Sequence, residues 1–213
     1  MAKLNLRTIH VWLSGSVLAL TVGGAAVAGP MEDAVLAEVN FARAYPQEYA
    51  RRLLMEPITP WERALEAGGQ PYDREAFIEA VEMLQRQEPL PPLKADEVLA
   101  GAALEHVSLQ GPAGLIGHSS PNGERFYDRL RRHGAADAIA AENIAYGPRI
   151  ASDVVRELII DSGVPSRGHR RNIFHASFEV VGISCGAHRD YSTMCVMDFS
   201  GASSLARTRQ AEE

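Results

Sequence analysis

Apolar residues recur at helical spacing along most of the first two thirds of the chain. In residues 31–54 they fall every three or four positions, and Pro46 interrupts the pattern. The segment 74–88 repeats the same spacing. The periodicity also predicts helices over residues 96–110, 124–134, 152–161 and 168–175. Asp96 and Ser152 precede two of these runs, so each is expected to cap the start of its helix.

The segments between the helices carry turn-forming residues. Residues 55–73 are rich in proline and glycine and predict a loop or a short helical insertion. Residues 89–96 contain three prolines and predict an extended connector. The clearest strands come last, at 178–185 and 194–201, and residues 138–147 also look extended. Helices followed by strands predict an α+β domain whose antiparallel sheet is covered by helices.

The first 28 residues differ from the rest of the chain. Lys3 and Arg7 precede an apolar run that ends in the small-residue pattern Ala26-Val27-Ala28. This arrangement predicts a secretory signal peptide over residues 1–28, and hence a secreted or periplasmic protein. The alternative is an uncleaved N-terminal anchor, which would be the only route to membrane association.

The charge of the chain argues against one class of partner. The formal net charge is -6, so nucleic acid is not an expected partner. Arginines cluster at 129, 131 and 132 and again at 167, 170 and 171, and we interpret both clusters as solvated faces.

Two cysteines, Cys185 and Cys195, lie in the last two predicted strands with polar and turn-forming residues between them. A hairpin would place the two sulfurs opposite each other, so a cross-strand disulfide is expected in an exported protein. A nucleophilic or metal-binding cysteine is the alternative, and it would need a partner that stabilises a thiolate.

Four residues capable of chemistry stand against apolar or glycine-rich sequence: His118, Glu142, Asp161 and His169. Val154, Leu158 and Asp161 fall at i, i+4 and i+7, so a continuous helix would bury the Asp161 carboxylate with its apolar face. Two imidazoles and two carboxylates could hold a divalent cation such as zinc, directly or through a water. They could equally form a closed hydrogen-bond network, because the bare sequence does not bring the four segments together.

Five segments, in this order and spacing, resemble the CAP superfamily of cysteine-rich secretory, antigen 5 and pathogenesis-related 1 proteins. They are LKADEVLAGAALEHV, GHSSPNGERFYDRL, AENIAYG, GHRRNIF and YSTMCVMDFSG, within residues 93–201. Residues 31–45 resemble the first helix of the family, with Asn40 and Arg43 in its Asn-x-x-Arg pattern. The resemblance implies a three-layer α-β-α sandwich with a central antiparallel sheet and a cleft lined by two histidines and two acids.

The family positions fall on His118, Glu142 and His169, and Asp161 stands where the family usually has a glutamate. We call these four residues the tetrad. The tryptophan that usually precedes that glutamate by three residues is Leu158 here. The resemblance divides the chain into a signal peptide, a CAP domain over 29–203 and a mobile tail over 204–213. Residues 46–90 would then be an insertion that caps one edge of the sandwich or covers part of the cleft.

The resemblance leaves three functions open. The first is a binding module whose His118 and His169 hold a divalent metal, possibly zinc, with Glu142 and Asp161 acting through water. Its ligand would be a lipid, a small molecule or a protein. The second is a metal-dependent hydrolase or peptidase with Glu142 or Asp161 as general base. The third is a non-catalytic structural protein of the cell envelope. The other histidines of the predicted domain, 106, 133, 175 and 188, are interpreted as surface or packing residues.

Overall fold

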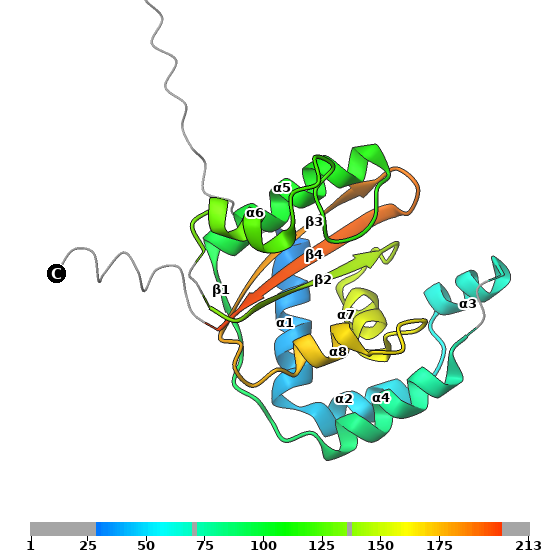
Figure 1. Ribbon diagram of the computed structural model, residues 1–213. Coiled ribbons are helices and arrows are strands. Elements are labelled where there is room, and N and C mark those ends of the chain that lie inside the picture. The colour runs from blue at the N-terminus through cyan, green and yellow to red at the C-terminus, as the bar shows by residue number, and fades with distance from the viewer. Residues whose placement is uncertain (1–28, 70–71, 136–137, 202–213) are drawn as a thin grey trace, which may run out of the picture.

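A four-stranded sheet forms the centre of the computed structural model, which describes residues 29–69, 72–135 and 138–201 (Figure 1). Its strands are β1 (Lys94–Ala95), β2 (Ala140–Tyr146), β3 (Val180–His188) and β4 (Ser192–Ser200), in the spatial order β1-β3-β4-β2. The three long strands pair antiparallel, as the sequence predicts. The two-residue β1 pairs parallel with β3, because the connector runs alongside β3 before the next helix begins. The signal-peptide prediction and the predicted tail lie outside the described residues.

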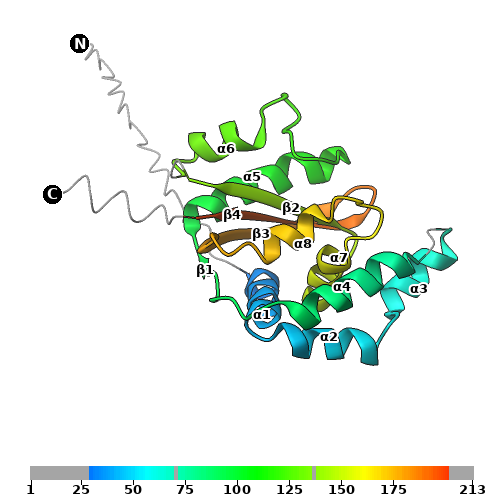
Figure 2. The same cartoon turned by 60° about the horizontal axis from the view of Figure 1, so that its bottom comes forward.

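Helices cover both faces of the sheet, so the predicted three-layer sandwich is confirmed (Figure 2). One face carries α5 (Glu97–Ala113) and α6 (Phe126–Arg132). The other carries α1 (Pro30–Ala44), α7 (Ala151–Ile160) and α8 (Gly168–Ile173). Side chains of β4 point alternately to the two faces of the sheet, so the strand contributes to both cores. Met197 and Phe199 pack with the α1 and α7 layer, and Met194 and Val196 pack with α5.

The predicted helix starts are right in one case and wrong in the other. The Asp96 side chain accepts hydrogen bonds from the backbone N–H groups of Val98 and Leu99, and it caps α5 as predicted. Ser152 is not a cap, because α7 already begins at Ala151 with Ile150 in the cap position and no side-chain cap bond.

Residues 46–90 are helical where the sequence predicts helices, and the segment 55–73 contains the short helical insertion rather than a loop alone. They form α2 (Pro46–Met55), α3 (Pro60–Ala67) and α4 (Arg74–Arg86). Pro46 and Pro60 each occupy a first helical position, where the missing N–H costs nothing, so both prolines start helices. Helices α2 and α4 pack together on the outer side of the α1 and α7 layer, and α3 lies beyond the end of α7 (Figures 1 and 2).

The Asn-x-x-Arg pair of α1 holds distant loops in place. Asn40 exchanges two hydrogen bonds with the backbone of Leu93. The fully buried Arg43 guanidinium donates to four carbonyls, those of Pro91, Ile173, His175 and Phe178. Burial lowers the Arg43 pKa to about 10. Arg43 therefore fixes the C-terminal end of α8, the helix that carries His169.

One further feature confirms a sequence prediction, and another refines one. Cys185 and Cys195 stand opposite each other in the β3–β4 register and form the predicted disulfide. Within the described residues no helix is long and apolar enough to cross a membrane. The arginine clusters are only partly solvated faces, since Arg129 and Arg170 are buried while Arg131 and Arg171 are exposed.

Candidate functional site

The site is organised around β2, which is an edge strand between the two helical layers. Successive side chains of a strand point to opposite faces of the sheet. Glu142 therefore faces the α5 and α6 layer, where it contacts Arg129 of α6. Its neighbour Asn143 faces the other layer and donates to the carbonyl oxygen of His169 over 3.0 Å. One edge strand thus contacts both halves of the tetrad.

The first half is the pair of His118 and Glu142. His118 Nδ1 lies 2.8 Å from Glu142 Oε1, and the other Glu142 oxygen forms an ion pair with Arg129. The side chains of Glu142 and Arg129 are fully buried, whereas that of His118 is 55% exposed. With Nδ1 held by a carboxylate, the neutral imidazole carries its proton there and presents Nε2 to solvent.

The loop that carries His118 is anchored by hydrogen bonds to side chains of α5 and β2. The Gly117 carbonyl accepts hydrogen bonds from His106 and Gln110 of α5, and the Gly117 N–H donates to the Tyr146 hydroxyl. Burial lowers the His106 pKa, so this histidine is neutral and serves packing, as predicted. Gly117 has a φ of +100°, which favours glycine at the turn into His118.

The second half is the pair of Asp161 and His169. His169 Nδ1 lies 2.7 Å from Asp161 Oδ1, while Asp161 Oδ2 accepts from the His169 backbone N–H over 2.9 Å. Asp161 is buried at 2% exposure, as the sequence predicts, but for a different reason. It is not the next residue of the helix face, because it ends α7 in the left-handed conformation, with φ 59°. This turn aims its carboxylate at the start of α8.

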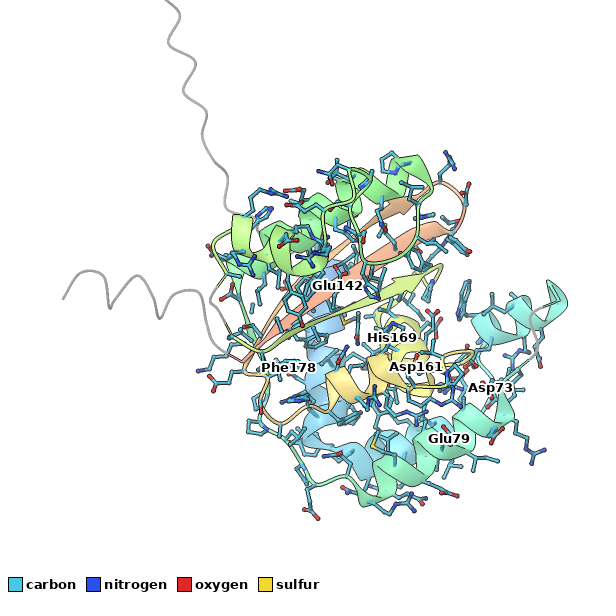
Figure 3. The ribbon with its side chains drawn as sticks, viewed as in Figure 1. Asp73, Glu79, Glu142, Asp161, His169 and Phe178 are labelled. Carbon is cyan, nitrogen blue, oxygen red and sulfur yellow. A yellow bond between two sulfur atoms is a disulfide. The ribbon has the colours of Figure 1, made fainter. Side chains whose placement is uncertain are left out.

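The two halves lie on opposite sides of β2. In Figure 3, Asp161 and His169 stand together on the α7 and α8 side, and Glu142 stands on the other side of the strand. Within the described residues, no group of three or more His, Cys, Asp and Glu side chains is close enough to hold a metal ion. The tetrad is therefore two separate histidine–carboxylate pairs that flank one strand.

A pocket of about 190 Å³ opens beside the second pair. Its described walls come from α3, from Tyr72, from α7 and the turn that follows it, and from His169 and Ile144. The Trp61 indole lies against Gly147, at the end of β2, where a Cβ would come within 2.4 Å of the ring. Glycine at this position therefore admits the indole. Residues 46–90 thus cover part of the cleft on the His169 side.

Buried acids dominate the electrostatics of both halves. Asp198 lies opposite Glu142 on the neighbouring strand β4 and is fully buried. Burial raises the Asp198 pKa well above its usual range, with a further contribution from the Glu142 charge. In the pocket, burial raises the Glu157 pKa to about 8, with additional repulsion from Asp161 and Asp153.

Sequence reasoning missed Arg129, Asn143, Glu157 and Asp198. Arg129 lies three residues after the buried Phe126 and beside the buried Leu130, a spacing that places it on the inner face of α6. Asp198 lies within a run of apolar residues in β4, and an acid in that context needs a partner or a proton. These two signals are visible in the sequence.

One pattern in the chain resembles a nucleophile motif. Gly182-Ile183-Ser184-Cys185-Gly186 matches G-x-S-x-G, which in hydrolases marks a sharp turn from a strand into a helix. Here the five residues lie in the middle of β3, and Ser184 is only 4% exposed. Cys185 is also consumed by the disulfide. Ser184 is therefore not in the position of a hydrolase nucleophile.

Comparison with known sequences gives a family match and one curated relative. The family model described as the cysteine-rich secretory protein family, CAP, matches residues 36–199. The Bacillus subtilis (strain 168) protein YkwD, described as uncharacterized, is 27% identical over 106 residues, which are 50% of this chain and 39% of YkwD. The chain therefore spans well under half the length of that relative.

Two solved structures of bacterial surface or extracellular proteins are similar to parts of this chain. An extracellular protein containing an SCP domain, from Bacillus anthracis strain Ames, is 22% identical with a TM-score of 0.43, and the match covers 58% of this chain and 38% of that protein. An outer surface protein from Borrelia burgdorferi is 20% identical with a TM-score of 0.46, and the match covers 61% of this chain and 95% of that protein.

Proposed function

Because this chain belongs to the cysteine-rich secretory protein (CAP) family, we propose that it is an exported binding protein whose tetrad holds a divalent metal, with zinc as the first choice. One observation carries the proposal: each tetrad histidine has its Nδ1 bound to a buried carboxylate. That arrangement fixes the tautomer of a metal-binding imidazole and raises its basicity. His118 and His169 lie on opposite sides of the edge strand β2, so they would supply their two Nε2 ligands across its open edge.

The donor chemistry fits zinc, and the two acids act from behind the imidazoles. Zinc takes nitrogen and oxygen ligands in a tetrahedral arrangement. Both oxygens of Glu142 and both oxygens of Asp161 are already engaged by protein donors. The protein would therefore give two imidazole ligands, and the remaining positions would be open to water or to a ligand. Such a metal would act as an anchoring point for the partner.

The hydrolase alternative is less well supported by the same contacts. A general base needs a free oxygen within hydrogen-bond reach of the proton that it removes. Glu142 accepts from His118 and pairs with Arg129, and Asp161 accepts from both the ring and the backbone of His169. The purely structural alternative does not explain why the His118 side chain is 55% exposed.

Export is supported by two sequence features. Residues 1–28 have the pattern of a signal peptide. The Cys185–Cys195 disulfide is of the kind that persists in oxidising compartments such as the periplasm or the extracellular space.

Calorimetric titration of residues 29–213 with zinc tests the metal proposal. We expect binding of one ion per chain, and loss of that binding in the variant His118→Ala/His169→Ala. The matched control is His133→Ala/His175→Ala, which removes two histidines that lie outside the tetrad. Binding that is unchanged in the first double variant, or that is lost equally in both, would contradict the proposal.

A further inference from the structure

The pocket beside His169 has features that a metal site does not need. It lies between α3 and α7, and neither His118 nor Glu142 lines it. Its volume of about 190 Å³ is modestly larger than the roughly 150 Å³ cavity that accommodates benzene. An occupant of about six to ten non-hydrogen atoms would fill it.

Half of the described residues that line the pocket are apolar or aromatic. Helix α3 contributes Trp61 and Leu65, and Tyr72 follows the same helix. The opposite wall is built from aliphatic side chains, namely Ile144, Leu158, Ile160 and Val164. Trp61 is held in place because its ring fills the space above Gly147. Such walls favour a ligand with a carbon skeleton over a hydrated metal ion.

The charged groups of the pocket are unbalanced. Among the described residues, four acids line it, namely Glu62, Asp153, Glu157 and Asp161, against the single arginine Arg156. Arg156 is already committed, because its guanidinium donates to Glu62 over 2.9 Å and to the Pro57 carbonyl over 2.7 Å. Asp161 is committed to His169. Of the remaining acids, Asp153 and Glu157, neither forms an ion pair with another described residue.

Glu157 is the group that points to a missing cation. Its Oε2 is buried and has no hydrogen-bond partner within the described part of the chain. Burial, with repulsion from Asp161, Asp153 and Glu62, raises its pKa to about 8. A buried carboxyl without a partner is costly, and a protein keeps one where a ligand supplies the missing contact.

We propose that this pocket binds a small organic monocation, a primary ammonium attached to a short aromatic or aliphatic group. On binding, the Glu157 carboxyl would release its proton to solvent and the ammonium would donate to the resulting carboxylate, while the carbon skeleton would lie among Trp61, Tyr72 and Leu65. The indole face adds a cation–π attraction. The same chemistry is present in a free amine and in the lysine side chain of a protein partner. The proposal does not depend on the metal, because the residues that would contact the amine, Glu157, Trp61 and Leu65, are not metal ligands in the first proposal.

Phenethylamine is a suitable probe. It has about nine non-hydrogen atoms in all, including the nitrogen of its primary ammonium, which is in the range of about six to ten that the pocket holds. Trp61 is the only tryptophan in residues 29–213, because the other one is Trp12, so its fluorescence reports directly on the pocket. We expect phenethylamine at pH 7.5 to change that fluorescence and to give heat in calorimetry. The neutral analogue 2-phenylethanol should bind at least tenfold more weakly, and the anion phenylacetate should not bind. Equal binding of the alcohol, or tighter binding of the anion, would overturn the proposal.

Matched variants locate the contact. Glu157→Gln keeps the size of the side chain, and we expect it to weaken phenethylamine at least tenfold. Glu66→Gln makes the same charge change on an exposed position of α3 and should leave the affinity unchanged. Thermal unfolding of both variants establishes that they are folded. Full affinity in Glu157→Gln, with the fold intact, would overturn the assignment.

Two further experiments distinguish a free amine from a partner's lysine as the ligand, and the amine proposal from the zinc proposal. If the natural ligand is a lysine of a partner, N-acetyl-lysine methylamide should bind more tightly than phenethylamine; the reverse order indicates a free amine. Failure of both ligands to bind would overturn the proposal. His118→Ala should abolish zinc binding and leave phenethylamine binding unchanged. Zinc binding without amine binding, or amine binding without zinc binding, therefore identifies which proposal has failed.

Discussion

The two histidine–carboxylate pairs look equivalent in the sequence, but their surroundings differ. Glu142 is neutralised by the buried Arg129 and lies next to the buried Asp198, whose pKa is raised by burial. Among the described residues, no buried guanidinium pairs with the Asp161 carboxylate, which is held by the ring and backbone N–H groups of His169. The first pair is a charge-balanced unit beneath an exposed imidazole. The second pair is one wall of an acidic pocket. In the two proposals above, the first half therefore supplies one metal ligand, whereas the second half supplies the other and lines the pocket for the amine.

Removing the counter-charge of the first pair is expected to have the largest effect on the free energy of unfolding. Arg129→Met should lower the free energy of unfolding by about 3–5 kcal/mol, because it leaves Glu142 buried without its counter-charge. Urea denaturation measures the loss. Arg131→Met, on an exposed side chain of the same helix, should change stability by less than about 0.5 kcal/mol. If both variants unfold at the same urea concentration, the buried ion pair does not stabilise the first half of the site.

The second pair can be tested through the wall of its pocket. Gly147→Ala places a Cβ on the Trp61 ring and on a residue with φ +108°, so we expect a loss of about 1–3 kcal/mol. Trp61 should move into solvent, which shifts its emission to longer wavelength. Trp61 is a proposed contact of the amine and not of the metal, so zinc binding should weaken less than phenethylamine binding. An unchanged emission spectrum would contradict the placement of Trp61 on Gly147.

The acidity of the pocket predicts a pH dependence. Glu157 has a folded pKa of about 8, raised above the ordinary 4.5, so the folded chain binds more protons than the unfolded chain between these values. Its contribution to stability is therefore fully present below about pH 4.5 and is lost as the pH rises to 8. Glu157→Gln should be more stable than the parent by about 1–3 kcal/mol at pH 8.5 and nearly equal to it at pH 4. Equal stability of the two proteins at both pH values would show that the Glu157 carboxyl is not held in a desolvated, negatively charged pocket.

The sequence predicts the local features of both halves. Helical periodicity, the resemblance to a known family and the position of the cysteines predict the layers, the disulfide and the four tetrad residues. The buried partner of Glu142 was missed because arginines 129, 131 and 132 look like one solvated cluster. Spacing from Phe126 distinguishes Arg129 from the other two, since residues three apart on a helix share a face.

Other features depend on contacts between distant segments. The stack of Trp61 on Gly147 joins residues far apart in sequence, and neither has a local signal for the other. The left-handed conformation of Asp161 decides where its carboxylate points, and helical extrapolation assumes that the helix continues. Aspartate tolerates this conformation better than most residues, so its identity permits the turn but does not predict it.

The smallest expected effect concerns the first residues of α5 and α7, the helices that support the two halves of the site. Asp96 caps α5 with two hydrogen bonds, whereas Ser152 lies inside α7 and makes no cap bond. Asp96→Ala should therefore cost about 1 kcal/mol of stability. Ser152→Ala should be neutral or slightly stabilising, because alanine is the better helix former by a few tenths of a kcal/mol. Chemical denaturation of both variants measures the difference. A loss of similar size in both would show that Ser152 caps α7 after all, and the start of α7 would then be better fixed than the structure indicates.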